Sequence, residues 1–284
     1  MEDLLKITVI TASYNAANTI EQTISSVIQQ DYPNIEYIIV DGKSTDGTAE
    51  IIEKYESYGI KWISELDDGL YDALNKGVRM ASGDYIQIIG ADDALTSTHT
   101  ISRIVQSIDS GVDILCAQEW LVNDNAKTQC AYTNKYARDQ AMYRGGMVPH
   151  AAMFVRRELL LRYPFDMHYR IAADYKFFLQ CYYDKTVKIR YSDEMVVFFS
   201  ASGISSDMKG CWEENDRIYR ELGLPFQSPD DAYSSPIKRK IKRCLIAIGL
   251  FFPARALWTM INTRLRWQKH TCENKICRWC GRYE

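Results

Sequence analysis

Residues 7–47 have the sequence ITVITASYNAANTIEQTISSVIQQDYPNIEYIIVDGKSTDG. The apolar run from Ile7 to Ile10 predicts a short strand, and apolar residues recur at helical spacing between Thr19 and Gln30. The Asp-Tyr-Pro-Asn segment at 31–34 predicts the end of that helix, and residues 35–40 predict a second apolar strand. This order of elements predicts a βαβ unit with two parallel strands.

The same alternation of strands and helices continues to residue 93. The further elements expected there are a helix after Asp46 or Thr48 that ends near Gly59, strands over 60–63 and 85–89, and a helix over 71–81. The pattern therefore predicts an α/β fold, with a mostly parallel sheet covered by helices on both faces. Beyond residue 93 we expect helices over 97–108, 155–162, 173–183 and 212–222, and strands over 112–117, 187–189 and 195–199.

Charge is distributed unevenly along the chain. The net charge is −3, yet residues 232–284 contain twelve of the 34 Lys and Arg residues and only two of the 37 Asp and Glu residues. The remainder of the chain is therefore acidic, which argues against a nucleic-acid groove in the main domain. The basic terminal region predicts an anionic partner.

The sequence predicts neither a membrane-spanning helix nor an export signal. The longest apolar run, residues 244–254, has eleven residues, whereas a bilayer-spanning helix needs about 20. The first residues, MEDLLK, lack the basic and then apolar layout of a signal peptide. We therefore expect a cytoplasmic protein whose eight cysteines are mostly reduced thiols.

Polar and acidic side chains follow each of the first four predicted strands. These segments are Thr11–Asn15, Asp41–Gly47, Glu65–Gly69 and Asp92–Asp93. Because ligands bind outside the carboxyl ends of parallel strands, these residues predict a ligand site at one edge of the sheet. The alternative is that they are ordinary loop residues, which are often polar and rich in glycine.

Acids gathered at one edge predict a bound cation. Carboxylates such as those of Asp92 and Asp93 suit Mg²⁺ or Mn²⁺, which bind through one or two carboxylates together with phosphate oxygens. The chain contains no P-loop sequence, and no Gly-x-Gly-x-x-Gly follows the first strand. These absences argue against a P-loop nucleotide site and a dinucleotide oxidoreductase.

Residues 8–15, TVITASYN, and 37–48, YIIVDGKSTDGT, together resemble the start of family 2 glycosyltransferases. Residues 64–77, SELDDGLYDALNKG, are similar to a block that is frequent in bacterial surface-polysaccharide enzymes of that family. Residues 83–93 resemble the strand that leads into the family's metal-binding Asp-x-Asp element. The similarity extends over about residues 6–205, and it implies the GT-A fold and a nucleotide-sugar donor.

The resemblance implies that five residues bind the nucleotide. Thr11, Ser13 and Asn15 would line the nucleotide pocket through backbone and side chain. Asp41 would accept a hydrogen bond from the base, and Asp67 would close the pocket near the base or ribose.

The resemblance also implies the residues around the diphosphate and the acceptor. Asp92 would face the ribose or sugar, and Asp93 would hold Mn²⁺ or Mg²⁺ against the diphosphate. Lys76 would add positive charge near the donor, with a solvated helix lysine as the alternative. Asp174 matches the catalytic base, although Ala replaces the Glu that usually precedes it; a helix cap is its alternative role. His150 resembles a residue near the acceptor site, and the alternative is a structural histidine.

The basic region from residue 237 to residue 270 predicts contact with a membrane or a second subunit. It contains nine basic residues among Ile, Leu, Phe and Trp, has no acid, and is divided by Pro253 into two helical stretches. Basic amphipathic helices suit the surface of an anionic membrane, such as the inner face of the plasma membrane. The alternative is a helical pair that packs on the catalytic domain or on a homo-oligomer partner.

Four possible Zn²⁺ ligands follow this region. They are His270, Cys272, Cys277 and Cys280, and their side-chain types are those of structural zinc sites. Only the spacing from Cys277 to Cys280 is that of a familiar zinc motif, so free thiols near a frayed end are the alternative.

Together these features predict an inverting, metal-dependent glycosyltransferase. It would move a sugar from a nucleoside diphosphate to a hydroxyl of a lipid-linked glycan in the biosynthesis of a cell-surface polysaccharide such as O-antigen or capsule. The expected parts are a nucleotide-sugar-binding half (1–95), an acceptor-binding half (96–224), a linker (225–236) and a basic helical tail with a Cys-rich end (237–284). The alternatives are a sugar nucleotidyltransferase and a catalytically silent nucleotide-binding module recruited to membranes.

Overall fold

The computed structural model describes residues 4–109, 111–133, 148–201, 203, 207–224 and 267–283. The predicted linker at 225–236 and residues 237–266 of the predicted amphipathic tail lie outside the described residues. None of the described helices combines the length and the apolar character that a bilayer-spanning helix requires.

The first half of the chain forms the predicted alternation of strands and helices. Its four main strands are parallel and lie in the order β3-β2-β1-β4. The elements are β1 (Ile7–Ser13), α1 (Ile20–Ile28), β2 (Ile35–Asp41), α2 (Thr48–Glu53), the 3-10 turn η1 (Glu56–Tyr58), β3 (Lys61–Ser64), α3 (Leu70–Met80) and β4 (Tyr85–Ile88).

The second half continues the same sheet with mostly antiparallel pairs. β8 is antiparallel to both β4 and β6, and it therefore joins the two halves into one sheet. The elements are β5 (Ala94–Leu95), α4 (Thr100–Ser107), β6 (Ile114–Asn123), β7 (Thr128–Tyr132), η2 (His150–Ala152), β8 (Met153–Arg156), α6 (Arg157–Arg162), α7 (Ala173–Tyr183), β9 (Ile189–Ser200), α8 (Met208–Glu221), β10 (Gln268–Lys269), β11 (Ile276–Cys277) and β12 (Arg282–Tyr283).

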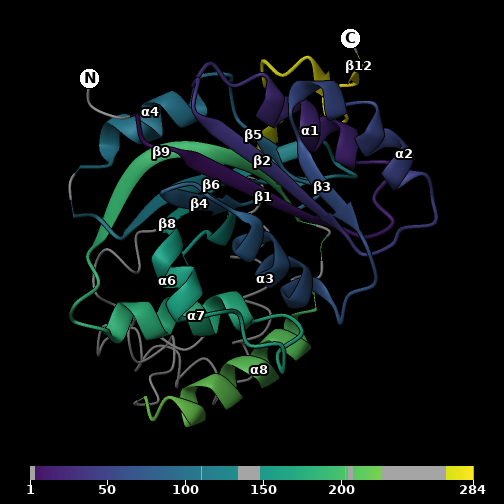
Figure 1. Ribbon diagram of the computed structural model, residues 1–284. Helices are drawn as coiled ribbons and strands as arrows, with labels where there is room; N and C mark the ends of the chain where they lie inside the picture. Colours follow the sequence, from purple (N-terminus) through teal and green to yellow (C-terminus); the bar gives the residue numbers. More distant parts are fainter. Residues whose placement is uncertain are drawn as a thin grey trace, which may run out of the picture.

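Two predictions in the second half were wrong in part, and one strand was not predicted. The predicted helix over 155–162 starts as strand β8 and becomes helical only at Arg157, because a short apolar run does not by itself separate strand from helix. Instead of two strands at 187–189 and 195–199, the structure has one long, curved strand, β9, which begins only at Ile189 (Figure 1). Strand β7 lies in a stretch for which no element was predicted.

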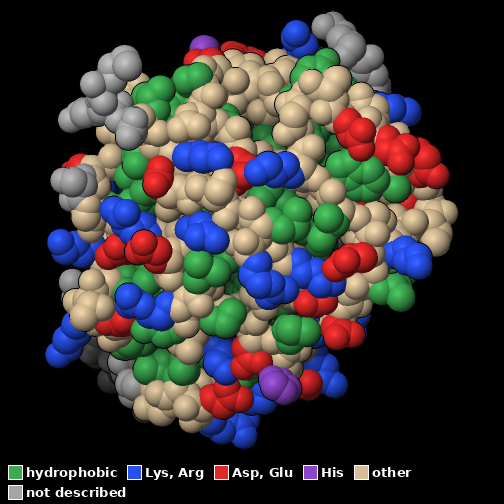
Figure 2. Space-filling model, in the orientation of Figure 1, with side chains coloured by type: hydrophobic (Ala, Val, Ile, Leu, Met, Phe, Trp, Pro, Cys, Tyr) green, Lys and Arg blue, Asp and Glu red, His purple; other side chains and the backbone are tan. Residues whose placement is uncertain are grey.

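The sheet separates two hydrophobic cores. Successive residues of a strand point to opposite faces, so Val9 packs with α1, α2 and α4, whereas Ile10 packs with α3, α6 and α7. Figure 1 shows these two groups of helices on opposite sides of the curved sheet. On the surface in Figure 2, Lys and Arg side chains are interspersed with Asp and Glu, which keeps the local electrostatic field mixed in sign.

Glu36 links three segments of the first half. Its side chain is 4% exposed, and it accepts hydrogen bonds from the Thr8 hydroxyl (2.7 Å), the Ser82 N–H (2.7 Å) and hydroxyl (2.8 Å), and the Lys61 ammonium (2.7 Å). Burial alone would raise the pKa of Glu36, but the hydrogen bonds from Lys61, Ser82 and Thr8 outweigh it and lower the pKa to about 2.

We expect Glu36→Gln to destabilise the protein by about 1–3 kcal/mol at neutral pH, because the amide cannot accept all four hydrogen bonds. Since the pKa of Glu36 is lowered by folding, its stabilisation is complete above its ordinary value of 4.5 and is lost as the pH falls from there towards about 2. Urea unfolding at pH 7 and pH 3 should therefore show a smaller difference from wild type at pH 3. The exposed Glu53→Gln is the control, and an equal difference at both pH values would contradict this account.

Candidate active site

Asp41 fixes the carboxyl ends of the three neighbouring strands β1, β2 and β3. The strand register places it beside Ser13 and Ser64. Its fully buried carboxylate accepts hydrogen bonds from the hydroxyls of Ser13 (3.0 Å), Ser64 (2.7 Å) and Ser44 (2.5 Å), and from the Ser44 N–H (2.9 Å). The strand ends are therefore held together by the chain's own side chains before a ligand binds.

The loops after β1 and β2 are tied to each other through Asn15. Its N–H donates to the Ser44 hydroxyl (2.8 Å), and its side-chain oxygen accepts from the Thr45 N–H (3.0 Å). Asn15 and Lys43 have φ angles of 49° and 60°, which are unfavourable for residues with a side chain. Two residues with positive φ in these adjoining loops indicate that contacts with the rest of the protein hold the backbone in an unfavourable conformation.

Thr11 and Asp67 contribute to this edge in different ways. The Thr11 side chain is fully buried beside the Tyr37 hydroxyl (3.2 Å), so it lies beneath the edge rather than on it. One Asp67 oxygen accepts from the Gly69 N–H (2.9 Å), and the other lies 2.6 Å from where a Cβ on Gly42 would stand. Only glycine at residue 42 allows Asp67 to approach the end of β2 so closely.

Lys76 is bound to acceptors of its own segment. Its ammonium lies 2.9 Å from Glu65 and 3.1 Å from Asp72, and donates to the Leu66 carbonyl (3.0 Å). The hydrogen bond with Glu65 is the main cause of the raised pKa of Lys76. With its side chain only 18% exposed, Lys76 holds the loop after β3 against α3.

Asp92 and Asp93 form the turn after β4 but differ in accessibility. The Asp93 side chain is almost fully buried, and its carboxylate accepts from the N–H groups of Gly90 (2.7 Å) and Ser200 (3.0 Å). Asp92 is partly exposed. A Cβ at residue 90 would lie 2.7 Å from Asp92 and 3.0 Å from Asp93, so this turn requires glycine there.

A third carboxyl group, that of Glu119, is buried near this turn. Glu119 lies on β6, is 3% exposed, and has one oxygen without a hydrogen-bond partner in the described part of the chain. Burial, and then the charge of Asp93, raise the pKa of Glu119, while burial and the charge of Asp92 raise the pKa of Asp93 to about 8. Burial also raises the pKa of Asp92, and the nearby Arg278 opposes this. Negative charge is therefore costly here unless a cation joins the acids.

Asp174 lies in the first turn of α7 and faces two polar side chains. The single hydrogen of the Tyr71 hydroxyl is shared between an Asp174 oxygen (3.0 Å) and the Ile171 carbonyl (2.6 Å). Nδ1 of His150 lies 3.6 Å from the other Asp174 oxygen, and the His150 ring packs edge-on against Phe199 (5.2 Å between centroids). Burial, and then the charge of Asp174, raise the pKa of Tyr71, so that its hydroxyl remains a donor.

The loop that leads to Asp174 is held by Glu214 of α8. The Glu214 carboxylate accepts hydrogen bonds from the backbone N–H groups of Arg170 (2.8 Å), Ile171 (2.9 Å) and Ala172 (2.8 Å). One side chain therefore binds three successive N–H groups immediately before α7. This arrangement sets where α7 begins and hence where Asp174 lies.

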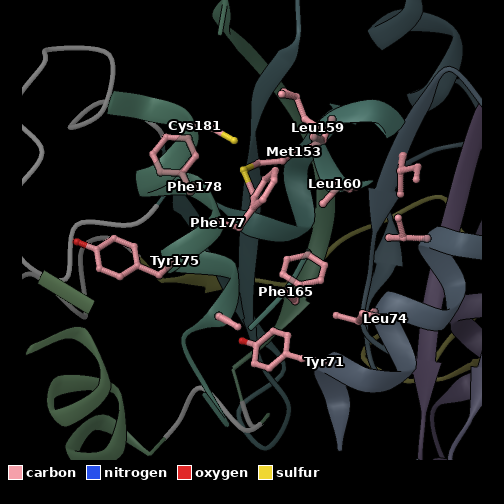
Figure 3. Close-up of a cluster of buried hydrophobic side chains, with 14 of the residues drawn as sticks. Tyr71, Leu74, Met153, Leu159, Leu160, Phe165, Tyr175, Phe177, Phe178 and Cys181 are labelled. Carbon is pink, nitrogen blue, oxygen red and sulfur yellow. The ribbon is translucent and has the colours of Figure 1, made fainter. Parts of the chain in front are cut away.

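A cavity of about 100 Å³ connects Asp174 with the turn after β4. His150 and Asp174 lie on its wall together with Gly90, whose N–H donates to Asp93. Most of the remaining wall is apolar, and Figure 3 shows Tyr71, Phe165 and other lining side chains within one cluster. The cavity therefore extends from Asp174 and His150 to the backbone of the turn that contains Asp92 and Asp93.

The four predicted zinc ligands also come together, at a place apart from Asp174. The ligand atoms of His270, Cys272, Cys277 and Cys280 lie within 4.8 Å of one another.

Tyr71, Glu119 and Glu214 were missed as site residues by the sequence analysis. Tyr71 lies inside the 64–77 block and could have been singled out there. Glu119 lies in a stretch without clear periodicity, and Glu214 is 43 residues away from the Ile171 N–H that it accepts from. No local pattern in the sequence indicates the last two.

We expect Glu214→Ala to lower the free energy of unfolding by about 2 kcal/mol, because three backbone N–H groups lose a charged acceptor. Activity should also fall by more than the loss of folded protein accounts for, because the loop before Asp174 would no longer be held in place. Glu213→Ala is the matched control, because the Glu213 side chain is 69% exposed and, among the described residues, forms an ion pair with Lys209 at 3.8 Å. Equal effects of the two substitutions, in urea unfolding and in turnover, would refute this role.

Sequence comparison relates the chain to known glycosyltransferases. Residues 8–163 match the sequence profile of glycosyl transferase family 2. A PGL/p-HBAD biosynthesis glycosyltransferase of Mycobacterium bovis is 27% identical over 201 residues, which cover 69% of this chain and 77% of the relative. The putative teichuronic acid biosynthesis glycosyltransferase TuaG of Bacillus subtilis is 41% identical over 91 residues, or 31% of this chain and 36% of TuaG.

Structural comparison gives the same fold. The mannosyltransferase PcManGT from Pyrobaculum calidifontis, solved with GDP-Man and Mn²⁺, superposes with a TM-score of 0.63 at 18% identity, covering 91% of this chain and 84% of that one. Residues 1–349 of S. aureus TarS with UDP-GlcNAc superpose with a TM-score of 0.58 at 20% identity, covering 80% and 69%. In the longer TarS structure the match covers 77% of this chain but only 43% of TarS. The family profile spans more than half of the chain, so the chain belongs to glycosyl transferase family 2 and is a glycosyltransferase with the GT-A fold.

Proposed function

We propose that this enzyme transfers a sugar, with inversion, from a nucleoside-diphosphate sugar to a hydroxyl of a cell-surface glycan. The observation that best supports this is the single cavity lined by both Asp174 and Gly90. A base for the acceptor hydroxyl and a turn suited to the donor diphosphate are thereby adjacent, as a direct transfer requires.

The donor side of the proposal rests on the carboxyl edge of the parallel strands. Ser13 and Asp41 end β1 and β2 at this edge. Asn15 and Asp67 lie in the loops that follow β1 and β3, and Thr11 supports the edge from beneath. TarS was solved with UDP and UDP-GlcNAc, and PcManGT with GDP-Man, at similar folds. These similarities support a nucleoside-diphosphate sugar as the donor, bound with its base near Asp41.

The turn after β4 fits a divalent cation. We assign the metal-facing oxygen to Asp92, because Asp92 is partly exposed, whereas Asp93 accepts two backbone N–H groups. The family resemblance implies Asp93 as the metal ligand. In this proposal the Asp93 carboxylate instead holds the backbone of the turn through its hydrogen bonds with the Gly90 and Ser200 N–H groups. When bound, Mn²⁺ or Mg²⁺ would neutralise the charge of the diphosphate leaving group. The crowding of Asp92, Asp93 and Glu119 supports a cation at this place.

Asp174 is the proposed base. As the acceptor oxygen forms its bond to the anomeric carbon, its proton passes to the Asp174 carboxylate. The bond from the anomeric carbon to the diphosphate oxygen breaks, and the nucleoside diphosphate leaves with the electron pair. Tyr71 and His150 hold Asp174 in place from opposite oxygens, at 3.0 Å and 3.6 Å.

The acceptor in this proposal is a lipid-linked glycan at the inner face of the plasma membrane. The names of the mycobacterial PGL/p-HBAD relative and of TuaG support a surface-glycan pathway. The basic amphipathic composition of residues 237–266 supports contact with an anionic membrane.

The donor site is tested by nucleotide binding. We expect one of UDP, GDP, dTDP and CMP to raise the melting temperature only together with Mn²⁺, since a ligand at ~100 Kd adds about 2.7 kcal/mol to the folded state. Asp92→Asn should abolish the metal-dependent rise in melting temperature. Asp93→Asn should do the same and should also lower the melting temperature of the protein without ligand. Glu213→Gln is the control. If no nucleotide shifts the wild type, the proposed donor site is wrong. Nucleotide binding without turnover of any sugar donor would favour the catalytically silent module instead.

The base is tested by separating turnover from binding. Asp174→Asn should lower kcat by about 10²–10⁴-fold and leave the nucleotide affinity unchanged, because only proton transfer is lost. Tyr71→Phe should lower kcat less, since it removes one hydrogen bond to the base and not the base itself. An Asp174→Asn enzyme with wild-type kcat, measured with an identified donor and acceptor, would exclude Asp174 as the base.

A further inference from the structure

The described residues 267–283 form a small unit that joins the main sheet through β10. Strand β10 is antiparallel to β7, and the His270 N–H donates to the Lys127 carbonyl (2.9 Å). Strands β11 and β12 form a short hairpin, with Cys277 on β11 and Cys280 in the turn between them.

Four side chains of this unit converge on one point. The Sγ atoms of Cys272 and Cys280 are 3.6 Å apart, and the Cys277 Sγ is 3.5 Å from Nε2 of His270. With Zn–S bonds of about 2.3 Å and a Zn–N bond of about 2.0 Å, a tetrahedral site has ligand separations of about 3.8 Å and about 3.5 Å respectively. All four ligand atoms lie within 4.8 Å of one another, so small side-chain movements would close the tetrahedron.

We propose that His270, Cys272, Cys277 and Cys280 bind one Zn²⁺ in a closed structural site. Three cysteines and one histidine are a ligand set that zinc prefers, and four protein ligands leave no position open for water or substrate. The Cys280 N–H points to the Cys277 Sγ (3.4 Å), an interaction that stabilises charge on a metal-bound sulfur.

The surroundings of the cluster suit a structural role. His270 and Cys277 are 3% and 0% exposed, and the His270 ring packs edge-on against Phe198 (4.6 Å) and Trp279 (5.1 Å). Cys277 and Trp279 share a small core with residues of β5, β6 and β9. A core of this size contributes little stability by itself, and the binding energy of a metal would supply the remainder.

The zinc unit would hold Arg278 and Trp279 against the catalytic domain. Both donate to Asp124, Arg278 at 2.9 Å and Trp279 at 2.6 Å, and Asp124 also accepts from the Ser200 hydroxyl (2.6 Å). The N–H of the same Ser200 donates to Asp93 (3.0 Å). A continuous set of hydrogen bonds therefore connects the zinc unit with the turn after β4.

The test measures metal in the full-length protein, purified under reducing conditions without a metal-affinity column. We expect elemental analysis and native mass spectrometry to give one Zn²⁺ per chain, and Cys277→Ser to lose it. Cys211→Ser is the matched control, since Cys211 lies on α8 outside the cluster, and it should retain the metal. Replacement of zinc by Co²⁺ should give the visible absorption of a tetrahedral cobalt–thiolate site in the wild type and not in Cys277→Ser.

The wild-type protein alone also tests the zinc site, so the proposal can be judged even if Cys277→Ser does not fold. A zinc-selective chelator, with Mg²⁺ kept in excess throughout, should remove the metal and increase hydrogen exchange at residues 267–283. Wild-type protein without zinc and without a cobalt spectrum would overturn the proposal. So would iron in place of zinc, a disulfide between Cys272 and Cys280 in the reduced protein, or exchange that is unchanged by metal removal.

Discussion

The carboxylate of Asp93 is the interaction on which the rest of the site depends. It is buried, and it accepts hydrogen bonds from the N–H groups of Gly90 and Ser200, at the ends of β4 and β9. It thereby joins a strand of the parallel half to a strand of the antiparallel half. Burial of a carboxyl group is costly, and the two N–H donors offset part of that cost. The cation that we propose at the neighbouring Asp92 would offset more of it. The buried Asp93 carboxylate therefore both fixes the geometry of the turn and makes a nearby positive charge favourable.

The first half of the fold was predictable because its signals are local. Each strand and helix up to residue 93 has its own apolar period, and the acids follow the strand ends in sequence. Asp41, Asp67, Asp92 and Asp93 could therefore be singled out before their positions were known. Which of the two adjacent acids is buried could not be predicted, because burial depends on tertiary contacts: the Asp93 side chain is almost fully buried, whereas Asp92 is partly exposed.

The second half was harder to predict for the opposite reason. Strand β8 is only four residues long and exists because β4 and β6 offer it hydrogen-bonding partners on both sides. Glu214 and Glu119 act on residues far away in the sequence, so their roles follow from tertiary contacts alone. The cluster of His270 and three cysteines was predictable in part. The sequence shows the ligand types, but only the fold shows that the four side chains meet.

The hydrogen bonds to Asp41 also bear on how the enzyme could evolve. Because that carboxylate accepts from Ser13, Ser44 and Ser64, a substitution that reshaped this edge of the sheet, where we propose that the nucleobase binds, would disturb the ends of three strands at once. The cavity wall beside Asp174 is built mainly from separate apolar side chains that can be exchanged one at a time. Under the proposed function, descendants of this sequence should therefore diversify in the glycan they extend more readily than in the nucleotide they use.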